Sequence, residues 1–579
     1  MTLYGLKWID LAMIVAYFLA ITIIGFWASR RVKNEGDFFL GGRKFGKGLL
    51  TMHWLCTGTH SEMAVQVAGA TARVGLGGIW YQWMWLFSTP FYWLIAPVTR
   101  RLRVTTTGDF FRIRYGRSLE MFYTLVALLY LALSIALLLR GAGAAISGAT
   151  GGLVPTERSV IVLAVLFSTY VMAGGLVAAA VTDVLQGVMI VVLSVMLIPA
   201  GLAHVGGFSG LHQQLGPGLF AITAPAGTRE GDPWFVVAMS LLGLVGVVVQ
   251  PHVMSATGSG KTETEARVGM VYGNLIKRLL TIAWAITGLI SIAAFPEILR
   301  GLDPASDEYR AASETLFGRS TQQFLGDGWR GLMIACLIAG VTSAETFMVV
   351  GSALFTRNIY RRVVGPRSPA QELLVGRLAS VGLLVLGIML ATWAGSVTQL
   401  VVLSVQLIGL LGAAFWLGVT WRRANAAGVW AGVAGGLSAW VIASLDTTTW
   451  QMRRLDHPGP ILAMLAVEFG LMILVSLCTR PAPAARLDPF FARLLTPVGL
   501  EATVMSDSGE IEDDDDVNLG MDGPSLDYGK AAHFGVARLQ ALGIEVPRMG
   551  VFDVAGFLLA WGMVAALIGL LVWLARWGG

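Results

Sequence analysis

Long apolar segments constrain this chain more than any other feature of its sequence. A helix needs about 20 such residues to cross the hydrocarbon core of a membrane, and the runs are continuous, unlike the alternating strands of a β-barrel. Charged residues make up 13% of the 579-residue chain, about half of the share in soluble domains. A soluble enzyme, a disordered chain and a disulfide scaffold are therefore excluded. We predict an all-α polytopic membrane protein with fourteen spans, near residues 8–28, 48–72, 76–98, 119–146, 158–174, 176–204, 233–255, 268–296, 328–356, 371–395, 397–420, 426–445, 459–479 and 551–576.

Glycine is abundant, with 71 residues, where average usage would give roughly 40. Small residues let the backbones of membrane helices approach closely. The composition therefore favours helices that pack tightly against one another in lipid.

Lysine and arginine predict the orientation of the chain, because they gather in cytoplasmic loops. Basic residues cluster in segments 30–47, 100–117, 357–367 and 422–423. All four clusters lie on one side of the membrane if the N-terminus is outside. We therefore expect a plasma-membrane protein with both termini extracytoplasmic, and its net charge of +5 indicates no nucleic-acid partner.

One polar segment interrupts the pattern of spans. Residues 480–549 contain no span, and ten acidic residues lie between Glu501 and Lys530. A charge run of this kind is typical of a solvated segment, so we interpret 480–549 as an acidic cytoplasmic linker before the last span, 550–579. A regulatory or calcium-binding tail is the alternative.

The second span contains an unusually polar run, Cys56 to Glu62. Gly58 stands between two threonines, which favours a broken helix whose freed carbonyls could coordinate a cation. A continuous helix with small residues packed against its neighbours is the alternative. Glu62 is a functional candidate, because ionisable groups inside a membrane are costly.

The ninth span carries a second polar run, Ala339 to Glu345. Residues three and four apart share a helical face, so Ala339, Thr342 and Ser343 offer oxygen atoms on one side. Hard cations prefer oxygen ligands, although packing of small residues explains the same pattern. Glu345 could be a second cation or proton site, or a charge in the cytoplasmic vestibule.

Other charges lie within predicted spans. Lys277 and Arg278 could reach a central cavity, or their side chains could extend to the membrane surface. Asp183 lies near the cytoplasmic end of the sixth span. Glu468 and Arg140 have no assigned role, and we expect them to pair with neighbours.

Three motifs in order resemble the sodium/solute symporter family, over roughly residues 5–480. The first is Asp37 to Arg43, with the sequence DFFLGGR, before the second span. The second, and the most specific, begins at Thr169 with TYVMAGGL and continues to Gln186. The third is LFTRNIY at Leu354–Tyr360, at the end of the ninth span.

This resemblance implies a LeuT-type fold, in which two inverted five-helix repeats hold the binding site at mid-membrane between broken helices. The repeats would be residues 48–205 and 233–420. The first helix with its loop, 1–47, two helices in 421–479 and the last helix would be additions.

The resemblance also implies a sodium site. Counted from the motifs, Ala339, Thr342 and Ser343 fall where family members hold sodium with one carbonyl and two hydroxyls. Cys56 and Thr59 fall where two backbone carbonyls complete that site. A carbonyl ligand tolerates a change of side chain, so cysteine at position 56 is compatible with the role.

The substrate residues are implied less completely. Glu62, Gln82 and Lys277 align with polar sugar contacts of the sodium/galactose member, and Tyr81 aligns with its outer gate. Asp183 aligns with an acidic residue near the sodium exit path.

Some positions depart from that member. Gly58 and Met63 stand where it has amide side chains, and Gln250-Pro251-His252 is similar to the sodium/proline member instead. The substrate therefore stays open at this point.

We hypothesise a sodium-coupled symporter that imports a small organic solute, such as a sugar, an amino acid or a carboxylate, by alternating access. Sodium would be a co-transported ligand, and no other cofactor is expected. The alternatives are a proton-coupled carrier that uses Glu62 or Glu345, a membrane sensor and a passive channel. No reactive constellation of residues predicts an enzyme.

Overall fold

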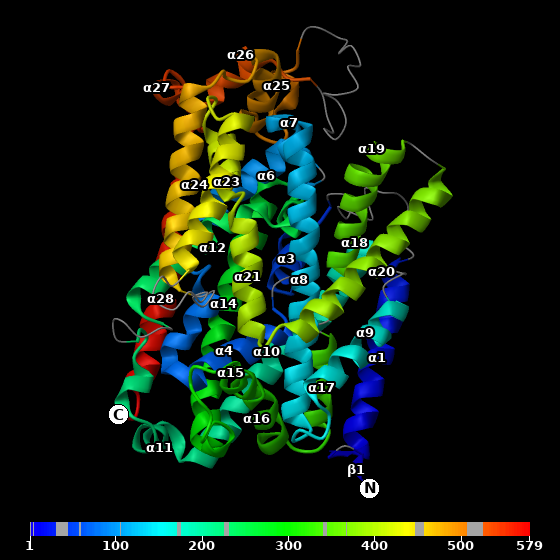
Figure 1. Cartoon of the computed structure of the whole chain (residues 1–579), viewed down its shortest axis with the longest axis vertical. Helices are drawn as coiled ribbons and strands as arrows, with labels where there is room; N and C mark the ends of the chain where they lie inside the picture. The colour runs from blue at the N-terminus through cyan, green and yellow to red at the C-terminus, as the bar shows by residue number, and fades with distance from the viewer. Residues whose placement is uncertain are drawn as a thin grey trace.

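The computed structural model describes residues 2–3, 5–29, 44–56, 59–104, 106–170, 175–224, 231–339, 344–365, 368–445, 457–506 and 525–579. The elements are almost all helices (Figure 1). A short antiparallel pair of strands, β1 (Thr2–Leu3) and β2 (Leu6–Lys7), precedes them. This agrees with the all-α fold class predicted from the apolar segments.

The first half of the chain forms the helices up to α10. Two of them are very long, since α8 and α10 have 33 and 31 residues. The helices are α1 (Trp8–Ser29), α3 (Lys47–Cys56), α4 (Ser61–Val74), α5 (Trp80–Trp83), α6 (Tyr92–Leu102), α7 (Thr107–Tyr115), α8 (Arg117–Ala149), α9 (Thr156–Tyr170) and α10 (Gly175–Val205).

The second half repeats the alternation of long and short helices. Its first members are α11 (Gly207–Gln214), α12 (Pro233–Gly246), α13 (Pro251–Gly258), α14 (Glu263–Ala294), α15 (Asp307–Glu314), α16 (Leu316–Phe324), α17 (Trp329–Ala339), α18 (Ala344–Leu354), α19 (Arg361–Val364), α20 (Pro369–Trp393), α21 (Val397–Gly409) and α22 (Gly412–Thr420). The last are α23 (Ala426–Ser444), α24 (Pro458–Cys478), α25 (Ala484–Leu495), α26 (Tyr528–Ala531), α27 (Ala537–Gln540) and α28 (Val551–Arg576).

Every apolar segment predicted from the sequence carries helix. Within the described part of the chain, eight helices are long and apolar enough to cross a membrane, or nine if the bent pair α12–α13 counts as one span. Several other predicted spans are divided into shorter helices, as α3 and α4 are. The multi-pass character is therefore clear, and the number fourteen stays a prediction.

Several helices begin at a capping residue, whose side chain accepts a hydrogen bond from a free backbone N–H group of the first turn. The Thr106 hydroxyl accepts from the Asp109 N–H at the start of α7, in a reciprocal capping box. Asp232 caps α12 through the Phe235 N–H at 2.6 Å, and Asn425 caps α23 through the Gly428 N–H at 2.9 Å.

Glycines allow the central helix α14 to approach its neighbours closely. A Cβ atom on Gly273 would lie 2.7 Å from the Thr51 carbonyl oxygen of α3. A Cβ on Gly288 would lie 2.5 Å from the Ala68 carbonyl oxygen of α4. Both positions exclude a larger side chain, which is the close packing that the glycine content predicts.

The helices that carry the predicted basic segments 100–117 and 357–367 reach one end of the molecule, which we name the basic end, whereas residues 30–43 of the first basic segment lie outside the described part of the chain. In Figure 1, α7 and α19 lie at the top, and the N- and C-termini lie at the lower end together with α11. The arginines of α6, α7 and α19 therefore share one end, as the orientation argument requires.

The segment after α24 is folded against the basic end, and we name its described residues, 480–506 and 525–549, the cap. Its helix α25 contacts α6 and α7, and Phe490 and Phe491 are buried. The interpretation of 480–549 as a solvated linker is therefore wrong for these residues. The acidic residues, between Glu501 and Lys530, follow the amphipathic helix α25, and it is α25 that carries the buried aromatic rings.

Charged contacts also hold the cap. Arg422, which follows α22, forms ion pairs with Asp488 and with Glu545, the second at 3.2 Å. Arg103 pairs with Glu501 at 2.5 Å. Burial and the hydrogen bond to Glu545 raise the pKa of Tyr528 to about 12, so its hydroxyl remains a donor at neutral pH.

We expect Phe491→Ala to loosen the cap. Truncation of a buried phenylalanine costs about 3–5 kcal/mol, and this ring also lies near the Arg114 and Arg422 guanidinium groups. Limited trypsin digestion should cleave the cap faster at Arg486 and Arg493. Leu542→Ala, at a cap residue that is 70% exposed, should leave the digestion rate unchanged, and equal rates in both variants would contradict the docked cap.

A polar cavity between two broken helices

The first broken helix is the one that the polar run in the second span predicts. Helix α3 ends at Cys56 and α4 begins at Ser61. His60 between them is extended, with φ −122° and ψ 173°. The break is therefore confirmed, and the alternative of a continuous helix is wrong. Residues 57–58, which include Gly58, lie outside the described part of the chain.

A second broken helix lies in the seventh span, where the sequence analysis did not expect one. The α12 axis continues through a short 3-10 turn, Val247–Val249, and α13 then turns away by 61°. Gln250 at the bend is extended, and Pro251 begins α13 without an N–H group to satisfy. The Tyr123 hydroxyl donates to the Val249 carbonyl at 2.9 Å. Pro251 was the signal that could have predicted this break.

Both breaks border one cavity of about 100 Å³. Its wall takes His60 from the first break and Gln250 and His252 from the second. Helices α8, α14 and α21 complete the enclosure. The cavity therefore joins the first helices of both predicted repeats, which is where transporters of inverted repeats bind their solutes.

The three substrate residues predicted from the resemblance all belong to this wall. Glu62 is at the start of α4, Gln82 is in α5, and Lys277 is in the middle of α14. They come from positions up to 215 residues apart (277 minus 62). The fold thus brings together side chains that the sequence could associate only through the resemblance.

Lys277 and Arg278 both line the cavity. This distinguishes a position at a central cavity from side chains that extend to the membrane surface. Lys277 lies 14 residues beyond Glu263, and that separation is about 21 Å along a helix. The lysine is 6% exposed and the arginine 2%. Side chains that extend to the membrane surface are therefore excluded.

Several polar atoms of the wall have no hydrogen-bond partner within the described part of the chain. Gln82 donates to Gln66 Oε1 at 2.7 Å, but Gln82 Oε1 is unpartnered. Glu62 Oε2 is also buried and unpartnered. Lys277 also lines the cavity and interacts electrostatically with Glu62. Buried polar groups are normally satisfied, so the cavity is equipped to receive a polar ligand.

Arg278 is held more firmly than Lys277. Its Nη1 donates to the Gln82 carbonyl at 3.1 Å, and its guanidinium lies 5.7 Å from the Trp85 ring centroid. The Trp83 indole donates to the Arg278 carbonyl at 3.2 Å. These contacts fix α14 against α5 and position the cationic group at the wall.

Other residues of the wall were not predicted from the sequence. Trp54, Trp85, Tyr130, Ser134 and His252 also face this cavity. Isolated aromatic and hydroxyl residues in apolar segments carry no distinguishing pattern, because the same types fill the cores of helix bundles. His252 follows Pro251 and could have been found with the second break.

The predicted sodium residues are described only in part. Cys56 is buried at the end of α3 and faces α10, where a Cβ on Gly187 would lie 2.5 Å from its Sγ. Thr59 is buried and its hydroxyl donates to the Leu55 carbonyl. Ala339 ends α17, which contacts α4 and α10. Thr342 and Ser343 lie outside the described residues.

Tyr81 does not belong to the described cavity wall, and Asp183 cannot be placed against it. Tyr81 is fully buried beside Phe235, with ring centroids 5.0 Å apart. Asp183 lies on α10, but its side chain is outside the described part. The roles of outer gate and ion path therefore stay predictions.

The two unassigned charges in the spans satisfy backbone groups. Arg140 donates to the carbonyls of Ala391 and Gly395, at 3.1 and 2.8 Å. Glu468 Oε1 accepts from the Ala413 N–H at the start of α22, at 3.1 Å. Arg140 therefore stabilises the end of α20, and Glu468 stabilises the start of α22. Each charge pairs with neighbouring groups, as expected from the sequence.

Comparison with known proteins agrees with this architecture. Residues 38–436 match the model of the sodium:solute symporter family. Among curated relatives, sodium/glucose cotransporter 4 of Danio rerio is 25% identical over 536 residues, 84% of this chain and 81% of that protein. The sodium/glucose cotransporter of Vibrio parahaemolyticus is 24% identical and covers 75% of this chain and 84% of its own. Sodium/myo-inositol cotransporter 2 of Oryctolagus cuniculus is 24% identical, covering 74% and 68%.

A solved structure shares the fold. It is the substrate-bound, outward-open state of a Na⁺-coupled sialic acid symporter, with a TM-score of 0.63 and 18% identity. The match covers 82% of this chain and 99% of that one. The LeuT-type fold expected from the motifs is thereby confirmed.

Gly141→Ala tests the close contact between α8 and the Glu62 backbone of α4. A Cβ on Gly141 of α8 would lie 2.3 Å from Glu62 Cβ and 2.4 Å from its Cα, so α4 must shift. We expect a loss of about 1–3 kcal/mol of stability, measured by thermal unfolding in detergent. Gly470→Ala on α24, where nothing lies within 4 Å, is the control. An unchanged melting temperature in Gly141→Ala would refute the close contact between α8 and α4.

Proposed function

The chain belongs to the sodium:solute symporter family, and on that premise we propose that it imports a small polar organic solute through the cavity between the two breaks. The observation that carries the proposal is the cavity itself, with its unpartnered Glu62 and Gln82 oxygens and the Lys277 ammonium group. Sodium is the co-transported ion, and the proposal includes neither a resident cofactor nor a catalytic activity.

We propose that sodium binds beside the first break. The carbonyls of Cys56 and Thr59 and the oxygens of Ala339, Thr342 and Ser343 are the ligands. Helix α3 ends at Cys56, and the Cys56 carbonyl accepts from the Thr59 N–H at 3.0 Å. A carbonyl oxygen has two lone pairs, so one remains for a cation. Hard cations prefer such ligands.

The solute contacts Glu62, Gln82 and Lys277 in this proposal. The cited relatives are named for glucose and for myo-inositol, and hydroxyl groups of such solutes can both donate and accept hydrogen bonds. Tyr81 acts as the outer gate, and Asp183 lies on the sodium exit path. Sugars, amino acids and carboxylates all remain compatible with these three contacts.

Transport proceeds by alternating access, in which residues 48–205 and 233–420 rock against each other as inverted repeats. The basic end faces the cytoplasm and both termini are extracytoplasmic, by the positive-inside rule. The membrane potential supplies about 2.3 kcal/mol per charge for each 100 mV. Sodium and solute must strengthen each other's binding equally, because coupling is reciprocal.

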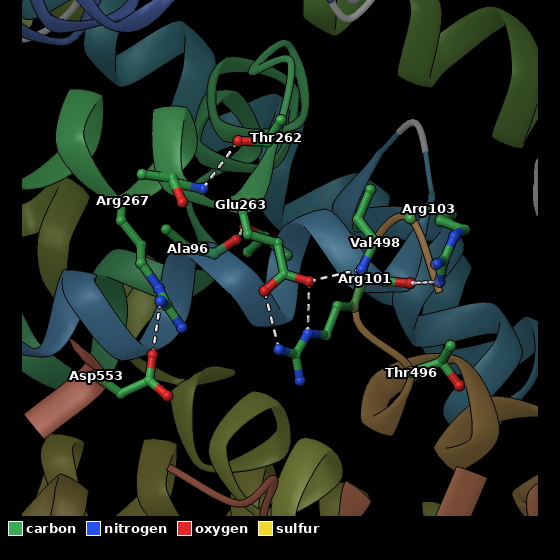
Figure 2. A network of polar contacts seen from close by, with 12 residues as sticks. Ala96, Arg101, Arg103, Thr262, Glu263, Arg267, Thr496, Val498 and Asp553 are labelled. Carbon is green, nitrogen blue, oxygen red and sulfur yellow. Dashed lines mark hydrogen bonds and ion pairs between the residues drawn. The ribbon is translucent and has the colours of Figure 1, made fainter. Parts of the chain in front are cut away.

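Contacts at the basic end must separate when the cavity opens to that side. The Glu263 carboxylate at the start of α14 accepts from Arg101 Nε and Nη2, both at 2.9 Å, and from the Val498 N–H of the cap at 2.8 Å (Figure 2). Arg101 and Glu263 belong to different repeats. Nearby, Arg267 pairs with Asp553 of α28 at 2.6 Å. This network therefore joins both repeats and the cap.

Removal of the hydroxyl ligands tests the sodium site. We expect Ser343→Ala or Thr342→Val to abolish most sodium-driven uptake into proteoliposomes, because each removes one oxygen ligand of the ion. Ser352→Ala is the matched control, since its hydroxyl donates to the Val349 carbonyl on the same helix. Full uptake by either variant, or full uptake with potassium in place of sodium, would falsify the site.

The buried and unpartnered Glu62 Oε2 favours one second candidate, a proton-coupled carrier of the same fold. Uptake measured against external pH at fixed sodium separates the two. A proton-coupled carrier runs on a pH gradient without sodium, whereas the proposed symporter stays inactive there.

Glu263→Gln tests the network at the basic end. Loss of the carboxylate charge weakens the bidentate contact with Arg101, so the basic end should open more often. The measurement is alkylation of a reporter, Asn274→Cys, by a hydrophilic reagent, with Cys478→Ser in the background.

We expect several-fold faster labelling with Glu263→Gln. Glu265→Gln is the matched control, because Glu265 lies on the same turn and its carboxylate accepts a hydrogen bond from the Thr262 hydroxyl instead of from Arg101. Equal labelling rates in both variants would show that the network does not hold this end closed.

A further inference from the structure

The charges of the cavity wall do not balance. Lys277 and Arg278 are two cationic residues, and Glu62 is the acidic residue among the wall positions that the structure describes. The formal charge of this wall is therefore +1, and a bound sodium ion would add to it. An uncompensated charge away from water is costly, so a solute that carries one negative charge is favoured over a neutral or zwitterionic one.

The unpartnered hydrogen-bonding atoms of the wall favour the same conclusion. The donors among them include Trp54 Nε1, Trp85 Nε1 and Arg278 Nε. The acceptors include Glu62 Oε2 and Gln82 Oε1, and the imidazole Nδ1 of His252 can take either role. A carboxylate only accepts hydrogen bonds and matches the donors, whereas the two acceptors require donor groups such as hydroxyls.

The two kinds of group also come from different elements. The cationic donors are adjacent on α14, and the acceptors are on α4 and α5. Arg278 Nη1 donates to the Gln82 carbonyl at 3.1 Å, so the cationic and acceptor residues lie close together. A ligand that satisfies both must therefore bear a carboxylate and hydroxyl groups near one another.

We propose that the solute of this transporter is a hydroxylated carboxylate, such as a sugar acid. Its carboxylate binds beside Lys277 and Arg278, and its hydroxyls donate to Glu62 and Gln82. This inference rests on the proposed function, because it assigns a class of solute to the same cavity. Lys277 and Arg278 are then the residues that determine the specificity for an acid.

Matched pairs of probes test the inference with the purified full chain. D-glucuronate differs from D-glucose, and D-glycerate from glycerol, by a carboxylate in place of a CH₂OH group. L-proline is the zwitterionic probe. Thermal stabilisation by each probe is measured in sodium chloride and in potassium chloride at equal ionic strength, since a ligand of the folded state raises its stability.

We expect at least one acid to bind about tenfold more tightly than its neutral partner, and only in sodium. Tighter or equal binding of D-glucose or glycerol, or binding of L-proline alone, overturns the inference and leaves the proposed function intact. A failure of every probe to bind also overturns it. If sodium itself has no effect on any probe or on the protein alone, the proposed function fails as well.

Charge-neutral variants identify the residues responsible. Lys277→Gln and Arg278→Gln should each lower the affinity for the preferred acid about tenfold and abolish the preference over its neutral partner. Lys277→Gln leaves the contact between Arg278 and the Gln82 carbonyl intact, so it covers the case in which Arg278→Gln fails to fold. Lys261→Gln removes an exposed positive charge before α14 and should keep the preference. A preserved preference in Lys277→Gln would contradict the inference.

Discussion

A backbone that is interrupted inside a membrane must have its freed N–H and C=O groups satisfied, because lipid offers no hydrogen bonds. Two breaks in the described part of the chain lie between α3 and α4 and at the bend before α13. Both breaks are enclosed by protein, and both border the same cavity. The location of the binding site therefore follows from where the backbone can be left irregular.

The close approach of the helices depends on residues without side chains. Gly273 and Gly288 let α14 contact α3 and α4, and Gly141 lets α8 contact the backbone at Glu62. Larger residues at these points would move the walls of the cavity. The close packing that the glycine content indicates thus also sets the position of the Glu62 carboxylate at the cavity wall.

Buried charges in the spans fall into two groups according to their partners. Arg140 and Glu468 satisfy backbone groups at helix ends and have a structural role. Glu62, Lys277 and Arg278 instead line the cavity. Because a charge inside a membrane is costly, a position at the cavity separates the charges available to a ligand from those that hold the fold.

The sequence alone determined the membrane class, the break after Cys56, the gathering of arginines at one end and, through its three motifs, the family and the fold. These features are local, since each depends on residues close together in the chain. The tertiary structure decided that Glu62, Gln82, Lys277 and Arg278 share one cavity, that the bend at Pro251 borders it, and that the acidic segment carries a docked cap. Those features depend on contacts between distant segments, and no local pattern specifies which side chains a packed bundle leaves without a partner.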